Sequence, residues 1–288
     1  MSKKQVHGAK KSTRRKELES YGFLGIHLGG AKSDRTAYAY VEYFPDQKKN
    51  FLNHVQTRIK ADGDISSDLL LYEEIIARKS KIKFLAYNVA LSLPKCMTCK
   101  LKCPGYEMCD EEEILWMWDN YRKNIEPRKN KKIFTPYTER CVEHYILAST
   151  DEKMQVQSAL GANMAPLTAR AHYINRRLKM PSIEVFPQLS VSRICAAIGV
   201  SKNSIQSYKH PVHGEGARQT ILKNLIDRKV SFFYEQDLRL LSANVESFEA
   251  YFSALTAVLK FKNQCEKRPK DFPRKEGWIE IPNESIVW

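Results

Sequence analysis

Four cysteines within one short window are the clearest sign of chemistry in this sequence. They are Cys96, Cys99, Cys103 and Cys109. Four soft thiolates on a turn-rich loop match the tetrahedral coordination of a structural zinc ion. Three lysines lie within 95–102 and would offset the negative charge of a tetrathiolate centre. We therefore expect residues 95–110 to form a closed, structural metal-binding loop.

Two alternatives to zinc remain for these cysteines. An iron–sulfur cluster is one, because three cysteines with this spacing before a proline also occur in ferredoxin patterns. A set of reduced thiols without a ligand is the other. The chain has seven cysteines, an odd number, and no export signal. This favours a reducing cytoplasmic location over a disulfide scaffold.

The charge of the chain indicates a phosphate-rich partner. Its 288 residues carry a formal net charge of +14 at pH 7. Each phosphate that binds a lysine or arginine releases counterions, so we expect nucleic acid as a partner, with solubility as the alternative use of the charge. Arg140 and Arg170 are the candidate nucleic-acid-binding residues, and Arg140 lies near an expected helix start where a phosphate can dock. Surface ion pairs are the alternative for both arginines.

Length and composition predict the domain organisation. Residues 1–18 are basic and nearly free of apolar side chains, so we expect a disordered tail there and one domain over 19–288. Hydrophobic residues make up 43% of the chain and charged residues 28%, as in ordinary globular proteins. No apolar run approaches the ~20 residues of a membrane-spanning helix, so no membrane partner is expected.

The apolar pattern predicts the strands that would position polar residues at one edge of a sheet. Three strands are expected, over 23–26, 36–43 and 51–59. An amphipathic helix over 65–76, with Asp64 as its N-cap, then leads to a buried strand over 84–91. This order predicts a meander beside a parallel strand that is reached through a crossover helix. His27 and Asn88 would then lie side by side, at the strand ends where ligands gather.

The rest of the chain is predicted to be largely helical. Helices are expected over 111–121, 138–147, 167–178, 217–227 and 247–260. Thr138 is the expected N-cap of the second of these helices. One further strand is expected over 183–186, and it ends at Pro187.

Five segments, taken in order, resemble one known family. They are Gly25-Ile26-His27, Asn88-Val89-Ala90-Leu91-Ser92-Leu93-Pro94, Ile183-Glu184-Val185-Phe186-Pro187, Phe248-Glu249-Ala250 and Gly277-Trp278-Ile279-Glu280-Ile281-Pro282. In them the chain resembles the domain-of-unknown-function 429 family, predicted nucleases of ribonuclease H-like fold. The resemblance implies an α/β fold, with a ribonuclease H-like mixed sheet flanked by helices. The four-cysteine loop would be an insertion into that fold.

The resemblance also implies a divalent-metal centre, from which this chain departs. In the family, acidic residues at these positions are expected to hold the divalent ions that cleave a phosphodiester. Carboxylates suit this role because Mg²⁺ prefers oxygen ligands. The matching residues, which form the candidate catalytic set, are His27, Asn88, Glu184 and Glu249. His27 and Asn88 stand where the family has Asp, and Glu249 is a longer carboxylate than the family's third Asp. The loss of two negative charges implies a site that holds Mg²⁺ poorly, although Mg²⁺ or Mn²⁺ remains a possible ion at this centre.

Other uses of these four residues stay open. Imidazole favours Zn²⁺, Mn²⁺ or Ni²⁺ over Mg²⁺, so His27, Glu184 and Glu249 could together hold one such ion. Equally, His27 could be a strand-end histidine with a backbone partner, Asn88 a turn residue and Glu249 part of a solvated helix flank. Glu184 is harder to explain in this way, because a carboxylate inside an apolar strand needs a partner.

Three functions fit these observations. The first is a nucleic-acid-associated protein with a degraded metal centre. The second is an active divalent-metal-dependent nuclease with a His/Asn/Glu ligand set. The third is a zinc-stabilised interaction protein with no nucleic-acid role. A phosphate loop like that of sugar kinases, at 25–32, is a further alternative, but the usual Asp is missing and no second glycine-rich loop follows.

Overall fold

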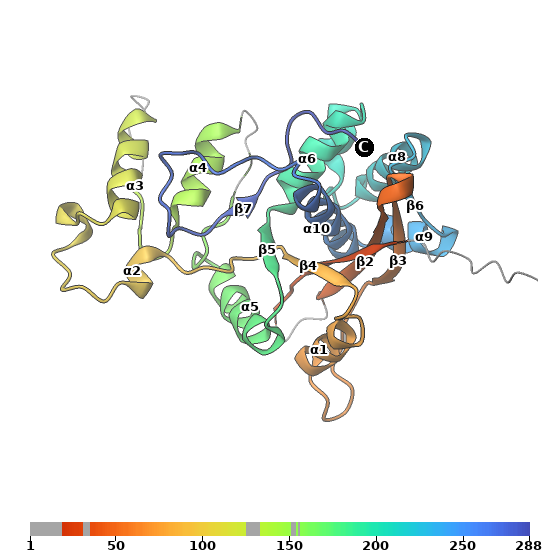
Figure 1. Ribbon diagram of the computed structural model, residues 1–288, viewed down its shortest axis with the longest axis horizontal. Helices are drawn as coiled ribbons and strands as arrows, with labels where there is room; N and C mark the ends of the chain where they lie inside the picture. Colours follow the sequence, from red (N-terminus) through yellow and green to blue (C-terminus); the bar gives the residue numbers. More distant parts are fainter. Residues whose placement is uncertain (1–18, 31–34, 125–132, 151–153, 155) are drawn as a thin grey trace, which may run out of the picture.

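The computed structural model describes residues 19–30, 35–124, 133–150, 154 and 156–288. In this part of the chain, a mixed seven-stranded sheet is flanked by helices (Figure 1). The expected α/β class with a mixed sheet is thus confirmed. The basic tail expected at 1–18 lies outside the described residues. None of the described helices has the length and apolarity needed to cross a bilayer.

The strands form an antiparallel meander that continues into a parallel half. The sheet order is β6-β3-β2-β1-β4-β5-β7. Strand β2 is antiparallel to β1 and β3, whereas β4 is parallel to β1, β5 to β4, and β7 to β5. The expected meander beside a parallel crossover strand is therefore confirmed. The bounds are β1 Tyr21–His27, β2 Ala37–Phe44, β3 Lys49–Gln56, β4 Ile82–Tyr87, β5 Ser182–Val185, β6 Ser231–Phe232 and β7 Ile279–Glu280.

Helices cover both faces of this sheet and extend beyond one edge. Their bounds are α1 Ser67–Ala77, α2 Lys95–Thr98, α3 Glu112–Lys123, α4 Cys141–Ser149, α5 Met164–Leu178, α6 Pro187–Ala197, α7 Lys202–Ser207, α8 Gly214–Asp227, α9 Glu235–Ala243 and α10 Val245–Phe261. Short 3₁₀ turns, η1 and η2, occupy Pro45–Gln47 and Tyr106–Met108.

One face of the sheet is covered by α10. Thirteen consecutive residues of this helix, Ser247 to Leu259, are buried. Its backbone comes so close to β1 that a Cβ built on Gly25 would lie 1.8 Å from the Ala250 carbonyl oxygen. Glycine at this position therefore sets how closely helix and strand can pack. The close packing fixes the start of α10 against the carboxyl end of β1.

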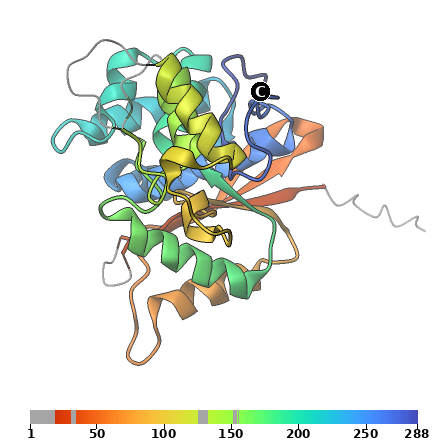
Figure 2. The same cartoon turned by 90° about the vertical axis from the view of Figure 1, so that its left-hand side faces the viewer.

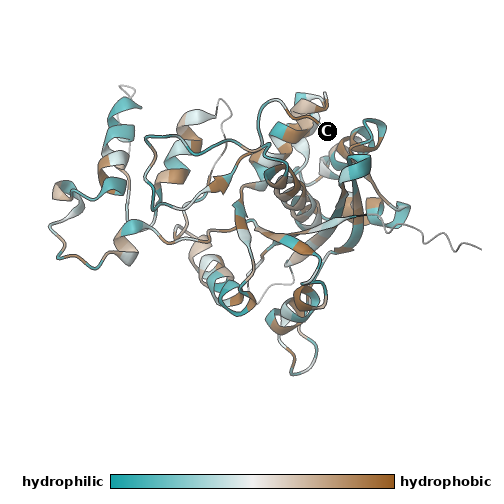
Figure 3. Ribbon diagram, viewed as in Figure 1, coloured by the Kyte–Doolittle hydropathy of each residue, from teal (hydrophilic) through white to brown (hydrophobic). Residues whose placement is uncertain are grey.

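The opposite face is covered by α1 and α5, which lie on the same side of the sheet in Figure 2. Leu71 and Ile75 of α1 join Ile174 of α5 in one apolar cluster with Leu24 and Ile26 of β1. A separate aromatic cluster lies beyond β7, where α3 and α4 pack against the C-terminal segment. Figure 3 shows many hydrophilic residues along α3, as expected for a helix on the outside of this cluster. The cysteine loop is attached here.

Both expected helix caps are wrong. Helix α1 begins after Ser66, whose hydroxyl accepts from the Leu69 N–H at 3.2 Å, so Asp64 lies in the preceding turn. Helix α4 begins at Cys141 with Arg140 as its N-cap residue, and Thr138 instead bonds to Thr135 one turn earlier. Ser and Asp cap helices with similar free energies, so the sequence alone does not select between Asp64 and Ser66 for α1. For α4, the N-cap residue is an arginine, a type that cap preferences do not indicate.

The expected strand over 84–91 is too long, because β4 ends at Tyr87. Asn88 leaves the strand, and its side-chain oxygen accepts from the Leu28 N–H at 2.8 Å. The elements α6, α7, α9 and β6 were not expected at all. Helix α6 follows β5 almost at once, with Pro187 in its first turn, where proline is favoured.

Candidate functional site

A cavity of about 730 Å³ lies at the carboxyl ends of β1, β4 and β5. The three strands run parallel, so their ends meet at one edge of the sheet. The start of α10 borders the same cavity. Its lining includes all four candidate residues, His27, Asn88, Glu184 and Glu249. The sequence-based expectation that these distant residues share one cleft therefore agrees with the structure.

Three of the four residues are in direct contact. His27 ends β1, and its Nδ1 lies 3.1 Å from Oε2 of Glu249. The Asn88 amide nitrogen lies 3.2 Å from the same imidazole nitrogen. Because Asn88 also accepts from the Leu28 N–H, its side chain ties the ends of β1 and β4 together. The contact between His27 and Glu249 joins the sheet to α10.

Glu249 is a buried carboxylate surrounded by donors. Only 5% of its surface is exposed, and its Oε1 accepts from the Tyr208 hydroxyl at 2.8 Å and from Lys209 Nζ at 2.6 Å. Burial alone would raise the pKa of Glu249, but the hydrogen bond to His27 and the charge of Lys209 lower it to about 2. Glu249 is therefore ionised at neutral pH. It is not on the solvated helix flank that the sequence left open.

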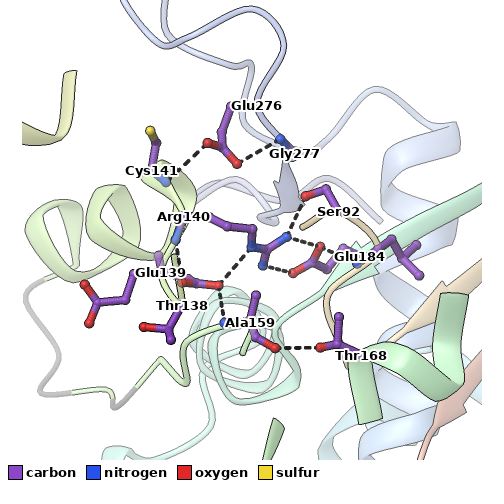
Figure 4. A network of polar contacts seen from close by, with 12 residues as sticks. Ser92, Thr138, Glu139, Arg140, Cys141, Ala159, Thr168, Glu184, Glu276 and Gly277 are labelled. Atoms are coloured by element: carbon purple, nitrogen blue, oxygen red, sulfur yellow. Dashed lines mark hydrogen bonds and ion pairs between the residues drawn. The ribbon is translucent and has the colours of Figure 1, made fainter. Parts of the chain in front are cut away.

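Glu184 is held by an arginine instead. Both of its carboxylate oxygens accept from Arg140, at 2.8 Å from Nη1 and 2.5 Å from Nη2 (Figure 4). The Leu91 N–H adds a third hydrogen bond at 3.0 Å. Arg140 is 1% exposed and Glu184 is 6% exposed, so this is a buried, bidentate ion pair. The partner that Glu184 needed inside its strand is thus a cation of the chain itself.

Arg140 also holds a second buried carboxylate. Its Nε donates to Glu143 at 2.9 Å, and Glu143 also accepts from the Arg140 and Ala159 N–H groups. The Ser92 hydroxyl accepts a second hydrogen bond from Nη1. Burial raises the pKa of Glu143 to about 7, and Arg140 opposes the rise. One guanidinium is shared between two buried acids, so most of its donors are used within the fold. Its expected phosphate contact stays a prediction.

Arg170 lies on α5 and faces inwards. Its Nε donates to Asp68 of α1 at 2.7 Å, and its Nη1 bonds to the Gly29 carbonyl oxygen and to the Thr36 hydroxyl. It is 6% exposed. The side chain therefore ties α5 to α1 and to the end of β1, below the cavity. These donors already form hydrogen bonds within the fold. The expected contact of Arg170 with nucleic acid stays a prediction.

The cysteine loop has little packing of its own. None of the residues 95–110 is buried. Its ends are attached to the aromatic cluster, through ion pairs of Lys95 with Glu111 and Glu113 and through the Tyr106 carbonyl, which accepts from the Trp118 indole. Among the described residues, no group of three or more His, Cys, Asp or Glu side chains is arranged to hold a metal ion. This holds for the cysteine loop and for the cavity.

Three important residues of the site were missed from the sequence. Tyr208 and Lys209 follow the short helix α7, and Glu143 lies on α4. No local pattern distinguishes such residues from surface polar residues. The one available signal was the need of an apolar-strand carboxylate for a cation, which correctly predicts a partner for Glu184 but does not identify it.

The chain was also compared with known proteins. No family model, no curated protein and no solved structure matches it. The family resemblance drawn from the five sequence segments therefore stays a prediction. The geometry of the cavity is the basis on which a function can be argued.

Proposed function

We propose that this chain is a nucleic-acid-associated protein of ribonuclease H-like fold whose metal centre has been replaced by internal ion pairs. The observation that carries the proposal is the pairing of both acidic candidate residues with cations of the chain. Glu249 contacts Lys209 and His27, and Glu184 contacts Arg140. A two-metal phosphodiesterase needs carboxylates that are available to the ions.

The arrangement of strands supports the fold assignment. An antiparallel meander of β1 to β3 lies beside the parallel strands β4 and β5, as the family resemblance implies. The cavity lies at the carboxyl ends of the parallel strands, where ligands of α/β sheets bind. The four residues that the resemblance singles out all line this cavity, although they come from distant parts of the chain.

The charges around the cavity explain why Mg²⁺ would bind poorly. Its lining includes three basic residues, Arg35, Arg140 and Lys209, and three acidic residues, Glu184, Glu246 and Glu249. A divalent ion would have to displace Arg140 or Lys209 from a carboxylate, and a displaced buried arginine would lose its ion pairs. Two-metal hydrolysis is therefore not the proposed activity.

The experiment is a pair of assays on the full chain with a labelled single-stranded oligonucleotide. Binding should weaken steeply with salt, because counterion release drives it. The slope of the logarithm of the binding constant against the logarithm of the salt concentration should correspond to several neutralised phosphates. Cleavage should not increase when Mg²⁺ or Mn²⁺ is added. A flat salt response would contradict nucleic-acid association, and cleavage that depends on Mg²⁺ and is lost in Glu184→Gln would contradict the loss of the metal centre.

We also propose that the cysteine loop binds zinc as a structural ion. Burial and the neighbouring thiols of Cys109, Cys103 and Cys99 raise the pKa of Cys96, so these three cysteines lie near Cys96. Binding requires the loop to close around the ion, which would order a segment that lacks a core. Elemental analysis should find about one zinc per chain, and Cys99→Ser should lose it, whereas Cys265→Ser, outside the loop, should retain it. Iron in place of zinc would indicate the cluster alternative, and no metal in the purified chain would refute the site.

A further inference from the structure

The contact between His27 and Glu249 favours one tautomer of the imidazole. Glu249 is ionised and can only accept hydrogen bonds, so the His27 Nδ1 at 3.1 Å carries the proton that is donated to it. In the tautomer that carries the proton on Nδ1, the lone pair of the imidazole is on Nε2. No hydrogen-bond partner of Nε2 is found among the described residues, and the His27 side chain, 19% exposed, borders the cavity. The ring that carries this acceptor therefore lines the space where a ligand would lie.

This imidazole is held rigidly from several elements. Glu249 is fixed by Tyr208 and Lys209, and by its place on the buried helix α10. The Asn88 amide nitrogen lies 3.2 Å from the same Nδ1, so this ring nitrogen is held between an amide and a carboxylate. A histidine that is oriented by a buried carboxylate through one nitrogen, with the other nitrogen available, is the arrangement that general-base catalysis requires.

We propose that His27 is a general base for metal-independent cleavage of RNA, with Glu249 as its positioning residue. The inference rests on the proposed function for its nucleic-acid partner. It goes beyond that proposal because it assigns to the cavity a reaction and a preference for ribose over deoxyribose in the substrate. The histidine that replaces a family Asp thereby supplies proton transfer in place of metal binding.

The chemistry explains why the substrate class is RNA. Without a metal-activated water, the most accessible nucleophile for a phosphodiester is the neighbouring 2′-hydroxyl, since its attack is intramolecular. His27 Nε2 takes the 2′-hydroxyl proton, the 2′-oxygen forms a bond to phosphorus, and the bond from phosphorus to the 5′-oxygen breaks. The departing 5′-oxygen takes a proton from water, so the products are a 2′,3′-cyclic phosphate and a 5′-hydroxyl. DNA lacks the nucleophile and would be bound but not cleaved.

Positive charge for the phosphate is available beside the histidine. Lys209 is half-exposed and lines the cavity next to Glu249, and Arg35 lines it near the end of β1. Glu246, the third acidic residue of the lining, accepts a hydrogen bond from the Asn244 amide at 3.0 Å. The cavity volume of about 730 Å³ lies within the range of ordinary ligand pockets.

The test uses a DNA oligonucleotide with one internal ribonucleotide, incubated with the full chain in excess EDTA. Cleavage should occur only 3′ to the ribonucleotide and should leave a 2′,3′-cyclic phosphate. His27→Ala should lower the rate at least ~100-fold, the usual contribution of a general base, and added imidazole should restore part of it. His213→Ala, an exposed histidine outside the cavity, is the matched control and should retain the rate.

Glu249→Gln should lower kcat more than it changes KM, because it leaves the imidazole in place but removes the acceptor that orients it. Binding without EDTA-resistant cleavage would overturn the dyad and leave the proposed function standing. Cleavage that His27→Ala does not change would also overturn it, since the activity would then come from another source. Failure to bind the oligonucleotide at all would refute the proposed function itself.

Discussion

At the scale of single residues, the site is governed by how buried carboxylates keep their charge. Glu249 and Glu184 are both almost fully buried, and each has a cation within hydrogen-bond distance. An unpaired carboxylate in such a place would protonate, so these pairs determine the electrostatics of the cavity. In the proposed function, the same pairs occupy the carboxylates that a divalent ion would need.

The lowered pKa of Glu249 predicts a pH-dependent contribution to stability. Its folded-state pKa of about 2 lies below the ordinary value of 4.5. The contribution is therefore present above pH ~4.5 and is lost as the pH falls towards ~2, and at ~1.4 kcal/mol per unit it amounts to ~3 kcal/mol. Urea unfolding at several pH values should show that the free-energy difference between wild type and Glu249→Gln shrinks across this window.

The control for this measurement is Glu73→Gln, an exposed acid on α1. It should change the free energy of unfolding little at any pH in the same range. A difference between wild type and Glu249→Gln that stays constant from pH 7 to pH 2.5 would show that the carboxylate gains no stability from His27 and Lys209.

Some contacts of the candidate site could be predicted from the sequence, and others could not. The proximity of His27 to Asn88 follows from two parallel neighbouring strands, which the apolar pattern indicates. The contacts of Lys209 and Arg140 depend on where loops and helix ends lie in the fold. The residue types alone do not determine these positions. Arg140 was expected to face a ligand, whereas the structure buries it between two glutamates.

At the scale of elements, the packing of α10 on β1 positions the dyad. His27 follows Gly25 by two residues, and Glu249 precedes Ala250 by one, so the close approach of helix and strand brings both side chains together. The register of α10 along β1 is thus part of the site. Long periodic elements such as α5, α8 and α10 were predicted from their apolar spacing, but the short α7 and β6 carry too few residues for a period to be recognised.

This packing predicts opposite effects of alanine at two glycines. Gly25→Ala would place its Cβ 1.8 Å from the Ala250 carbonyl oxygen and should destabilise the chain by about 1–3 kcal/mol through overpacking. Gly216→Ala lies on α8 with no atom within 4 Å of the new Cβ, and should stabilise it by about 0.5–1 kcal/mol through helix propensity. Denaturant unfolding measures both. Equal effects of the two substitutions would refute the close contact between α10 and β1.

At the scale of the whole molecule, a large positive charge coexists with a cavity whose own charges are nearly balanced. The net charge of +14 attracts polyanions to the surface, while equal numbers of acidic and basic residues line the cavity. The proposed association with nucleic acid and the proposed chemistry in the cavity are therefore separable. The sequence predicts the first from composition alone, but the second depends on tertiary contacts.

The most direct measurement of the central claim is a calorimetric Mg²⁺ titration of the wild type beside the double variant His27→Asp with Asn88→Asp. Two added carboxylates next to Glu249 should recreate an oxygen-rich centre. The account predicts no Mg²⁺ binding by the wild-type cavity at millimolar concentrations and at least a tenfold gain in affinity for the double variant. Wild-type binding that is lost in Glu184→Gln, or no gain in the double variant, would contradict it.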